Sequence, residues 1–159
     1  MRPNILLLER TDSSNPDFRK LVALLDADLA IRDGDEHAFY AQFNKVDQIR
    51  HCLVGRLEGE PLACGAIRAL DDQTMEVKRM FVQPQHRGKG YAGLVLAELE
   101  QWAAELGYPR TVLETGKKQP EAIALYLKSG YQIIPNYGQY AGVENSVCME
   151  KRLKHFSGL

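Results

Sequence analysis

The residues best suited to chemistry form a short basic turn in the middle of the chain. The turn reads QHRGKG from Gln85 to Gly90 and lies between an apolar segment, 75–82, and an amphipathic run that starts at Tyr91. A strand, a glycine-containing turn and a helix in this order direct free backbone N–H groups and the positive helix end at one point. Glycine permits positive φ and close approach of a ligand, while Arg87 and Lys89 add positive charge. The turn therefore predicts a site for an anion such as a diphosphate.

Two other phosphate-binding motifs fit this turn less well. The string Gly88-x-Gly90-x-x-Gly93 matches the glycine spacing of a dinucleotide-binding turn. However, the turn lies in mid-chain, is strongly basic, and is not followed by an acidic strand end about 20 residues further on, since Glu114 lies beyond that spacing. A P-loop would need Ser or Thr directly after Gly-Lys. From the turn alone, an ordinary strand-to-helix loop with solvated charges stays open.

Length and composition predict a single domain over residues 1–159. Hydrophobic side chains make up 45% of the 159 residues, which is enough to build one core. The formal net charge of −1 argues against a nucleic acid as the main partner. The apolar run from Ile5 to Leu8 is too short for a signal-peptide core or a membrane span. We therefore expect a cytoplasmic protein that does not contact a membrane.

The cysteines predict neither a disulfide framework nor a metal site. Cys52, Cys64 and Cys148 lie in apolar segments without CxxC or Cys/His spacing, and an odd number cannot form a closed disulfide set. We expect reduced thiols that pack as small buried hydrophobic side chains, with a reactive thiol as the alternative.

Hydrophobic periodicity predicts the elements that position the turn. Two-residue alternation indicates strands, and an apolar stripe at three- and four-residue spacing indicates helices. The three strands after His51 form an antiparallel meander, because short turns at 58–60 and 71–73 join them. We expect strands near 4–9, 51–57, 61–69, 75–82, 111–115, 131–135 and 146–152, and helices near 16–31, 36–43, 91–106 and 120–128.

Two blocks of sequence resemble the GNAT acetyltransferase superfamily. Val82-x-Pro84 followed by Gln85-x-x-Gly88-x-Gly90 and a helix resembles the family's acetyl-CoA-binding motif, Gln/Arg-x-x-Gly-x-Gly/Ala. A second block, QPEAIALYLKSGY from Gln119 to Tyr131, resembles the family pattern Asn-x-x-Ala-x-x-Leu-Tyr-x-x-x-Gly-Phe/Tyr. The second block departs from the pattern at Gln119, which carries the amide of the usual Asn one methylene further out. The whole resembles small bacterial acetyltransferases of unassigned substrate.

The resemblance implies a fold and a cosubstrate. The fold is α/β (α+β), a GNAT fold with a mixed, mostly antiparallel sheet of six or seven strands and helices on both faces. The cosubstrate is acetyl-CoA, with no metal. In this family the main chain at Met80 would donate to the thioester carbonyl, and the main chain at Val82 would pair with the pantetheine amides. The implied cofactor-binding residues are Met80, Phe81, Val82, Gln85, His86, Arg87, Gly88, Lys89, Gly90, Tyr91, Ala92, Gln119 and Tyr126.

Acetyl transfer also needs an acid and a base. Backbone donors must face the thioester carbonyl, a base must take the amine proton, and an acid protonates the leaving sulfur. Tyr126 matches the family's acid position, and the alternative is a helix tyrosine packed in the core. Glu76 begins the strand that leads to the turn and is the candidate base, acting directly or through water; the alternative is a solvated strand-end charge. Lys78 and Arg79 are either solvated charges or clamps for an acidic group on the acceptor.

Candidate acceptor-binding residues lie in two further segments. Aromatic residues of the predicted 36–43 helix and of segment 134–148 would line the acceptor side, with packing as the alternative in both cases. We predict acetyl transfer to a primary amine of a small metabolite, amino-acid-like or other, by direct attack on the thioester. A protein N-terminal or lysine acetyltransferase and a non-catalytic acyl-CoA-sensing domain are the alternatives, and a homodimer is left open. The candidate residues are Tyr40, Phe43, Arg79, Tyr137 and Tyr140.

Overall fold

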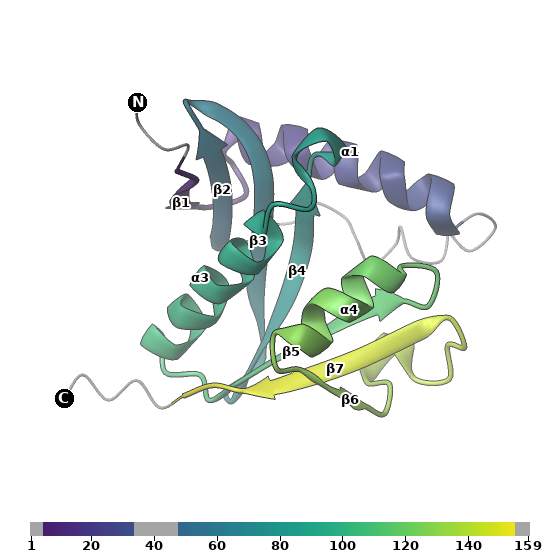
Figure 1. The fold of residues 1–159 in the computed structure, drawn as a ribbon. Helices are drawn as coiled ribbons and strands as arrows, with labels where there is room; N and C mark the ends of the chain where they lie inside the picture. The colour runs from purple at the N-terminus through teal and green to yellow at the C-terminus, as the bar shows by residue number, and fades with distance from the viewer. Residues whose placement is uncertain (1–4, 34–47, 155–159) are drawn as a thin grey trace.

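The central meander forms as the alternating pattern predicts. In the computed structural model, which describes residues 5–33 and 48–154, β2 (His51–Leu57), β3 (Glu60–Asp71) and β4 (Thr74–Val82) pair antiparallel in that order (Figure 1). Glu58 and Gly59 both have positive φ and join β2 to β3 in a two-residue turn. Two such residues match the right-handed twist of paired strands, which is why this short connection closes the hairpin.

Four more strands complete a seven-stranded mixed sheet. Its order is β1-β2-β3-β4-β5-β7-β6, and the β4–β5 pair is parallel while the other pairs are antiparallel. This confirms the predicted mixed, mostly antiparallel sheet. The added strands are β1 (Leu7–Thr11), β5 (Arg110–Gly116), β6 (Gln132–Ile134) and β7 (Ser146–Arg152).

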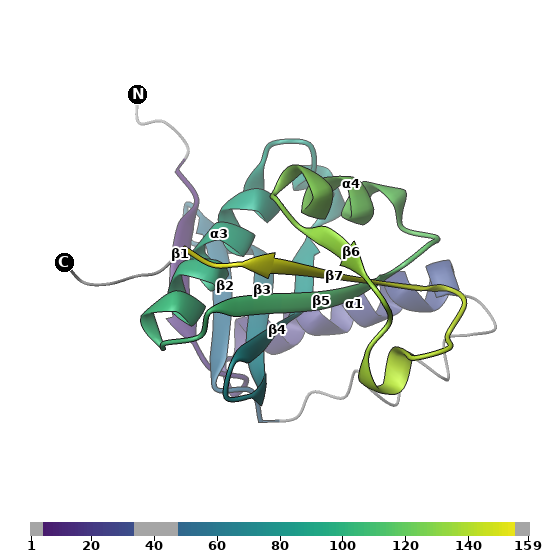
Figure 2. The same ribbon diagram turned by 90° about the horizontal axis from the view of Figure 1, so that it is seen from below.

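Helices cover both faces of the sheet, as predicted. Helix α1 (Pro16–Asp33) packs on one face, and α3 (Tyr91–Glu105) and α4 (Pro120–Lys128) pack on the other (Figure 2). The α1 side buries Phe18 and Leu21 against β2 and β3, while the α3 side buries Val95 and Leu99. Each face therefore has its own apolar core, with the sheet between them.

The first strand and the first helix differ from the prediction in detail. The strand begins at Leu7 rather than near residue 4, because its position is set by pairing with β2 and not by the apolar run itself. Leu7 is exposed, as a residue of an edge strand can be, and Ile5 before the strand is exposed as well. Leu24 is 44% exposed on α1, whereas Phe18 and Val22 are buried. The predicted helix at 36–43 lies outside the described residues.

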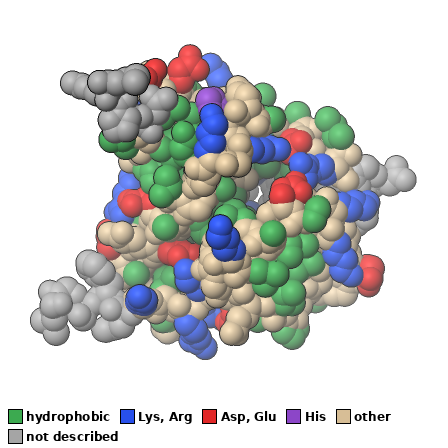
Figure 3. Space-filling view, in the orientation of Figure 1, with side chains coloured by type: hydrophobic (Ala, Val, Ile, Leu, Met, Phe, Trp, Pro, Cys, Tyr) green, Lys and Arg blue, Asp and Glu red, His purple; other side chains and the backbone are tan. Residues whose placement is uncertain are grey.

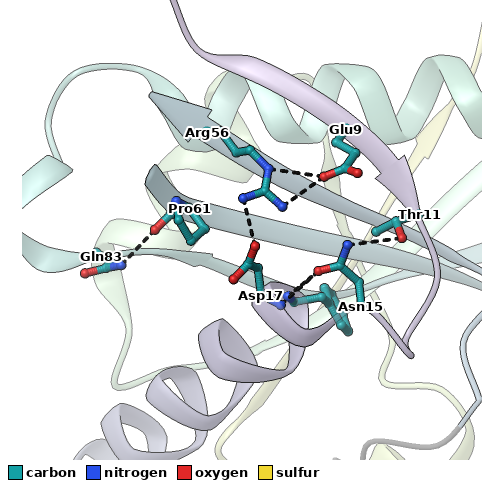
Figure 4. A network of polar contacts seen from close by, with 8 residues as sticks. Glu9, Thr11, Asn15, Asp17, Arg56, Pro61 and Gln83 are labelled. Carbon is teal, nitrogen blue, oxygen red and sulfur yellow. Dashed lines mark hydrogen bonds and ion pairs between the residues drawn. The ribbon is translucent and has the colours of Figure 1, made fainter. Parts of the chain in front are cut away.

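A polar network fixes where α1 starts relative to the sheet (Figure 4). The Asn15 side-chain oxygen accepts hydrogen bonds from the backbone N–H groups of Asp17 and Phe18, at 2.9 and 3.1 Å. This is an N-cap, which satisfies donors that a helix cannot pair internally. Arg56 on β2 then joins Glu9 on β1 to Asp17 on α1, at 3.0 and 2.8 Å. The helix is thereby held at a defined position over β2.

Two further observations concern the cysteines and the helices. Cys52, Cys64 and Cys148 are free and buried, and burial raises the pKa of the Cys52 thiol to about 12. A thiol that stays protonated is a poor nucleophile, so the packing interpretation fits better than a reactive thiol. Within residues 5–33 and 48–154, no helix is long and apolar enough to cross a bilayer.

Candidate active site

The site begins where two neighbouring strands separate. Strands β4 and β5 pair in parallel only from Thr74↔Arg110 to Glu76↔Val112, and beyond Glu76 they share no register pair. Two hollows lie along the separated part of β4, one on each side of Met80 and Tyr126. We call the hollow beside the glycine turn the groove and the hollow beside Glu76 the inner cavity.

A β-bulge in β4 aims its main chain at the junction of the two hollows. Cys64 pairs with Phe81 but Ala66 pairs with Lys78, so β4 carries one residue more than β3 over this stretch. Arg79 adopts φ +61°, and an extra residue of this kind leaves backbone groups outside the ladder. Facing the bulge, Gly65 leaves room for the Met80 side chain, because a Cβ there would lie 2.9 Å from the Met80 sulfur. No local sequence signal marks the bulge.

The end of β4 also presents main-chain groups to the groove. The Gln83 N–H donates to the Leu62 carbonyl at 2.9 Å, which makes the neighbouring Val82↔Ala63 pair the non-hydrogen-bonded one. The N–H and C=O of Val82 therefore point away from β3. The carbonyl accepts a hydrogen bond from Arg87 Nε at 2.8 Å. Main-chain pairing of Val82 with an extended ligand fits this orientation and stays a prediction.

The basic turn has the geometry that its glycines imply. After a 3₁₀ turn at Pro84–His86, Gly88 and Gly90 have φ of +80° and +84°, and Gly90 is the residue that precedes α3. A Cβ at either glycine would meet no protein atom within 4 Å. Glycine is thus required by the backbone conformation, and the space beside it is open to a ligand.

The groove collects most of the predicted cofactor-binding residues. It has a volume of about 340 Å³ and lies between β4, the turn, the start of α3, and α4. In the space-filling view a hollow opens between the turn and α4, with side chains of both charges beside it (Figure 3). All the predicted cofactor-binding residues line the groove except Gln85 and Lys89.

Three charged residues that we did not predict also line the groove. Arg32 of α1 pairs with Asp28 at 3.3 Å and with Glu121 of α4, so ion pairs join the two helices beside the groove. Asp28 also lies 3.8 Å from Arg87. Asp28 lies on the same face of α1 as Leu25. A carboxylate within an apolar stripe is the sequence signal from which Asp28 could have been predicted as a site residue.

The inner cavity is smaller and lined by buried charges. Its volume is about 130 Å³, and it shares Leu25, Met80 and Tyr126 with the groove. Lys78 and Arg79 line it with side chains only 8% and 2% exposed, so neither is a solvated charge. Burial lowers the pKa of Lys78, although the nearby Glu76 carboxylate opposes the shift. Arg79 pairs with Asp26 of α1 at 3.1 Å.

Glu76 lies in the wall of this cavity and is 2% exposed, so it is not a solvated strand-end charge. Its Oε2 accepts a hydrogen bond from the Tyr137 hydroxyl at 2.6 Å. Its Oε1 lies 3.3 Å from Arg68 Nη2 and 3.7 Å from Lys78 Nζ. Glu114 on β5 is a second carboxylate on the cavity wall. It lies within an apolar segment of the sequence, and no motif identifies it as a site residue.

Tyrosines complete the inner cavity. Tyr126 and Tyr140 are buried and line it, whereas Tyr137 reaches Glu76 from the loop before β7. Burial raises the pKa of all three hydroxyls, and nearby carboxylates raise it further. All three therefore stay protonated at neutral pH. The remaining acceptor candidates, Tyr40 and Phe43, lie outside the described residues.

The fold and the site define an acyltransferase of the GNAT type. Residues 15–131 match the model of the family described as Acetyltransferase (GNAT) family. The chain belongs to this family, and the enzyme is an acyltransferase. Both the predicted resemblance and the predicted fold are thereby confirmed.

Relatives and solved structures agree with this assignment. The chain is 42% identical over 103 residues to an IAA acetyltransferase of Azospirillum brasilense, over 64% of this chain and 67% of the relative. It is 38% identical over 99 residues to the uncharacterized N-acetyltransferase YsnE of Bacillus subtilis, over 60% and 66%. The alignments thus span about two thirds of these relatives. A putative acyl-CoA N-acyltransferase structure from Klebsiella pneumoniae has TM-score 0.79 and 32% identity, over 94% of this chain and 99% of that one.

A more distant structure shares the fold. It is a GNAT family acetyltransferase from Elizabethkingia anophelis with acetyl-CoA bound, with TM-score 0.68 and 16% identity, covering 96% of this chain and 100% of that one.

Proposed function

We propose that this enzyme transfers the acetyl group of acetyl-CoA to a primary amine of a small metabolite. The observation that carries the proposal is the position of Tyr126, which lies in the walls of both the groove and the inner cavity. A donor in one hollow and an acceptor in the other would meet at this shared wall. Holding two reactants at such a junction makes their reaction effectively unimolecular.

The groove fits acetyl-CoA in three respects. The turn leaves open space at Gly88 and Gly90, at the N-terminus of α3, where an anionic diphosphate is favoured. The outward main chain of Val82 suits the amides of an extended pantetheine arm. The acetyltransferase from Elizabethkingia anophelis, which shares this fold, has acetyl-CoA bound. These features support acetyl-CoA as the donor.

Acetyl-CoA supplies a thioester whose carbonyl carbon an uncharged amine can attack. The main chain of the β4 bulge near Met80 donates to the carbonyl oxygen as it gains negative charge. Glu76 takes one proton from the amine nitrogen, directly or through water, and Tyr126 gives one proton to the sulfur as the C–S bond breaks. Solvent then returns a proton from Glu76 to Tyr126. Because the pKa of Tyr126 is raised, its hydroxyl is protonated before the C–S bond breaks.

The inner cavity supports a small, polar acceptor. Buried Lys78 and Arg79 share it with Glu76 and Glu114, so both signs of charge line its wall. An acceptor that carries an amine together with an acidic group, as an amino acid does, would complement both signs. Tyr140 closes part of the wall and disfavours an extended peptide.

An acceptor panel tests the proposal. Purified enzyme and acetyl-CoA would be incubated with amino acids, with their decarboxylated amines and with a lysine-containing peptide, and free thiol release would be followed. We expect turnover with at least one small amine and a higher kcat/KM for the carboxylated member of a matched pair. Turnover with the peptide alone would favour a protein acetyltransferase. Calorimetric CoA binding without turnover on any acceptor would favour a sensing domain.

A further inference from the structure

We propose that Tyr137 is a positioning residue that orients the Glu76 carboxylate toward the acceptor amine. The inference rests on the proposed function, in which Glu76 takes the amine proton. Tyr137 acts through Glu76, since its hydroxyl contacts that carboxylate and its side chain is not part of the cavity wall.

The contact between the two residues is short and lies in a buried setting. The Tyr137 hydroxyl lies 2.6 Å from Glu76 Oε2, which is the length of a hydrogen bond to a charged acceptor. Burial and the Glu76 charge together raise the pKa of Tyr137, so the hydroxyl keeps the proton that it donates. A hydrogen bond to a carboxylate contributes more to the free energy than one between two neutral groups.

The two oxygens of Glu76 are held from different elements. Tyr137 from the loop before β7 holds Oε2, while Arg68 of β3 and Lys78 of β4 approach Oε1. With one oxygen fixed by cations and the other by a hydroxyl, the plane of the carboxylate is defined. Without the hydroxyl, the carboxylate can rotate about its last side-chain bond, and the proton acceptor moves away from a productive position.

The loop that carries Tyr137 is itself anchored. The Asn136 side-chain amide donates to the Val143 carbonyl at 3.0 Å and to the Ser146 carbonyl at 3.1 Å, which closes the loop at its base. The ring of Tyr137 packs edge-to-face on Tyr140, with centroids 5.8 Å apart. Tyr140 in turn lines the inner cavity. The loop therefore places Tyr140 in the cavity wall and Tyr137 against the Glu76 carboxylate.

The test is the variant Tyr137→Phe, which keeps the ring and its packing and removes only the hydroxyl. We expect kcat to fall about tenfold, with KM for both substrates nearly unchanged, because the lost hydrogen bond to a charged group acts on the proton transfer. The matched control is Tyr131→Phe. Tyr131 is also buried and shares a 2.8 Å hydrogen bond with Thr111, yet it lies on neither hollow. It should lose stability and keep its kcat.

A double-mutant cycle separates positioning from an independent role. In a Glu76→Gln background, Tyr137→Phe should cause little further loss, because residues that act as a unit are not additive. If Glu76→Gln does not fold, Glu76→Asp provides the same cycle. Full kcat in Tyr137→Phe, a change confined to KM, or an equal loss in both backgrounds would overturn the inference alone. Full kcat in Glu76→Gln would overturn the base role in the proposed function as well.

Discussion

The groove and the inner cavity meet at Tyr126 but are built in different ways. The groove joins the end of β4, the positive-φ turn with Gly88 and Gly90 and the start of α3 to residues of α1 and α4. The inner cavity is formed by buried side chains from β4, β5 and the loop before β7, including Glu76 and Tyr140. One hollow thus contains a turn that depends on backbone conformation, and the other depends on buried charges that the fold brings together.

This difference indicates how each hollow should respond to change. A site made of backbone groups tolerates many side chains but fails when the conformation is blocked. A site made of buried charged and hydroxyl groups fails when one functional atom is removed, even if shape is kept. The comparison predicts that donor binding and chemical turnover can be lost separately.

The largest expected effect is on donor binding. Gly90→Glu would place a side chain and a negative charge at the open face of the turn, so CoA affinity should fall by at least about 10²-fold, more than 2.7 kcal/mol. Calorimetry with CoA measures this. The control is Gly59→Glu, which imposes the same change at a glycine with φ +85° in the β2–β3 turn, a residue that does not line the groove. Equal affinity in wild-type and Gly90→Glu would remove the turn from the donor site.

The second effect should appear in turnover alone. Tyr126→Phe keeps the packing of the ring and removes the proton donor, so kcat should fall by about 10²-fold while the CoA dissociation constant changes little. The rate of thiol release at saturating substrate concentrations gives kcat, and calorimetry gives the CoA dissociation constant. A Tyr126→Phe enzyme with full kcat would leave solvent as the acid and Tyr126 as a packing residue.

The smallest effect concerns stability at high pH. The folded-state pKa of Tyr126 is raised, so its contribution is fully present below the unfolded pKa of about 10 and is lost as pH rises further, when only the unfolded chain ionises. The unfolding free energy should decline above pH 10 by up to about 1.4 kcal/mol per pH unit for this residue. Urea denaturation at pH 9 and 10.5 should show a shallower decline for Tyr126→Phe. Parallel declines would mean that Tyr126 ionises equally in both states.

The sequence was sufficient for most of the fold and for the groove. Periodicity and capping residues located α4 and β7 at their observed bounds. The turn motif located one side of the groove, because the residues of the motif are neighbours in the chain. Local patterns report local backbone, which is why this part could be predicted.

The inner cavity was harder to predict for the same reason. Glu76 and Tyr137 are 61 positions apart, and no spacing rule links them. Lys78 and Arg79 are charged residues of a kind that is usually solvated, and only the fold shows that their side chains are buried. The β4 bulge depends on pairing with β3 rather than on the β4 sequence, so it too could not be read in advance.

The separation of β4 from β5 has one further consequence. Beyond Glu76, β4 behaves as an edge strand inside the molecule, because its pairing with β5 has ended while its pairing with β3 continues. Exposed edges invite extension by any extended chain, and proteins usually block them with charge or irregular geometry. Here the bulge at Arg79 makes the edge irregular, and the Arg87 side chain hydrogen-bonds to the Val82 carbonyl. Under the proposed function, the main chain that would bind the donor would thus also exclude other extended peptides.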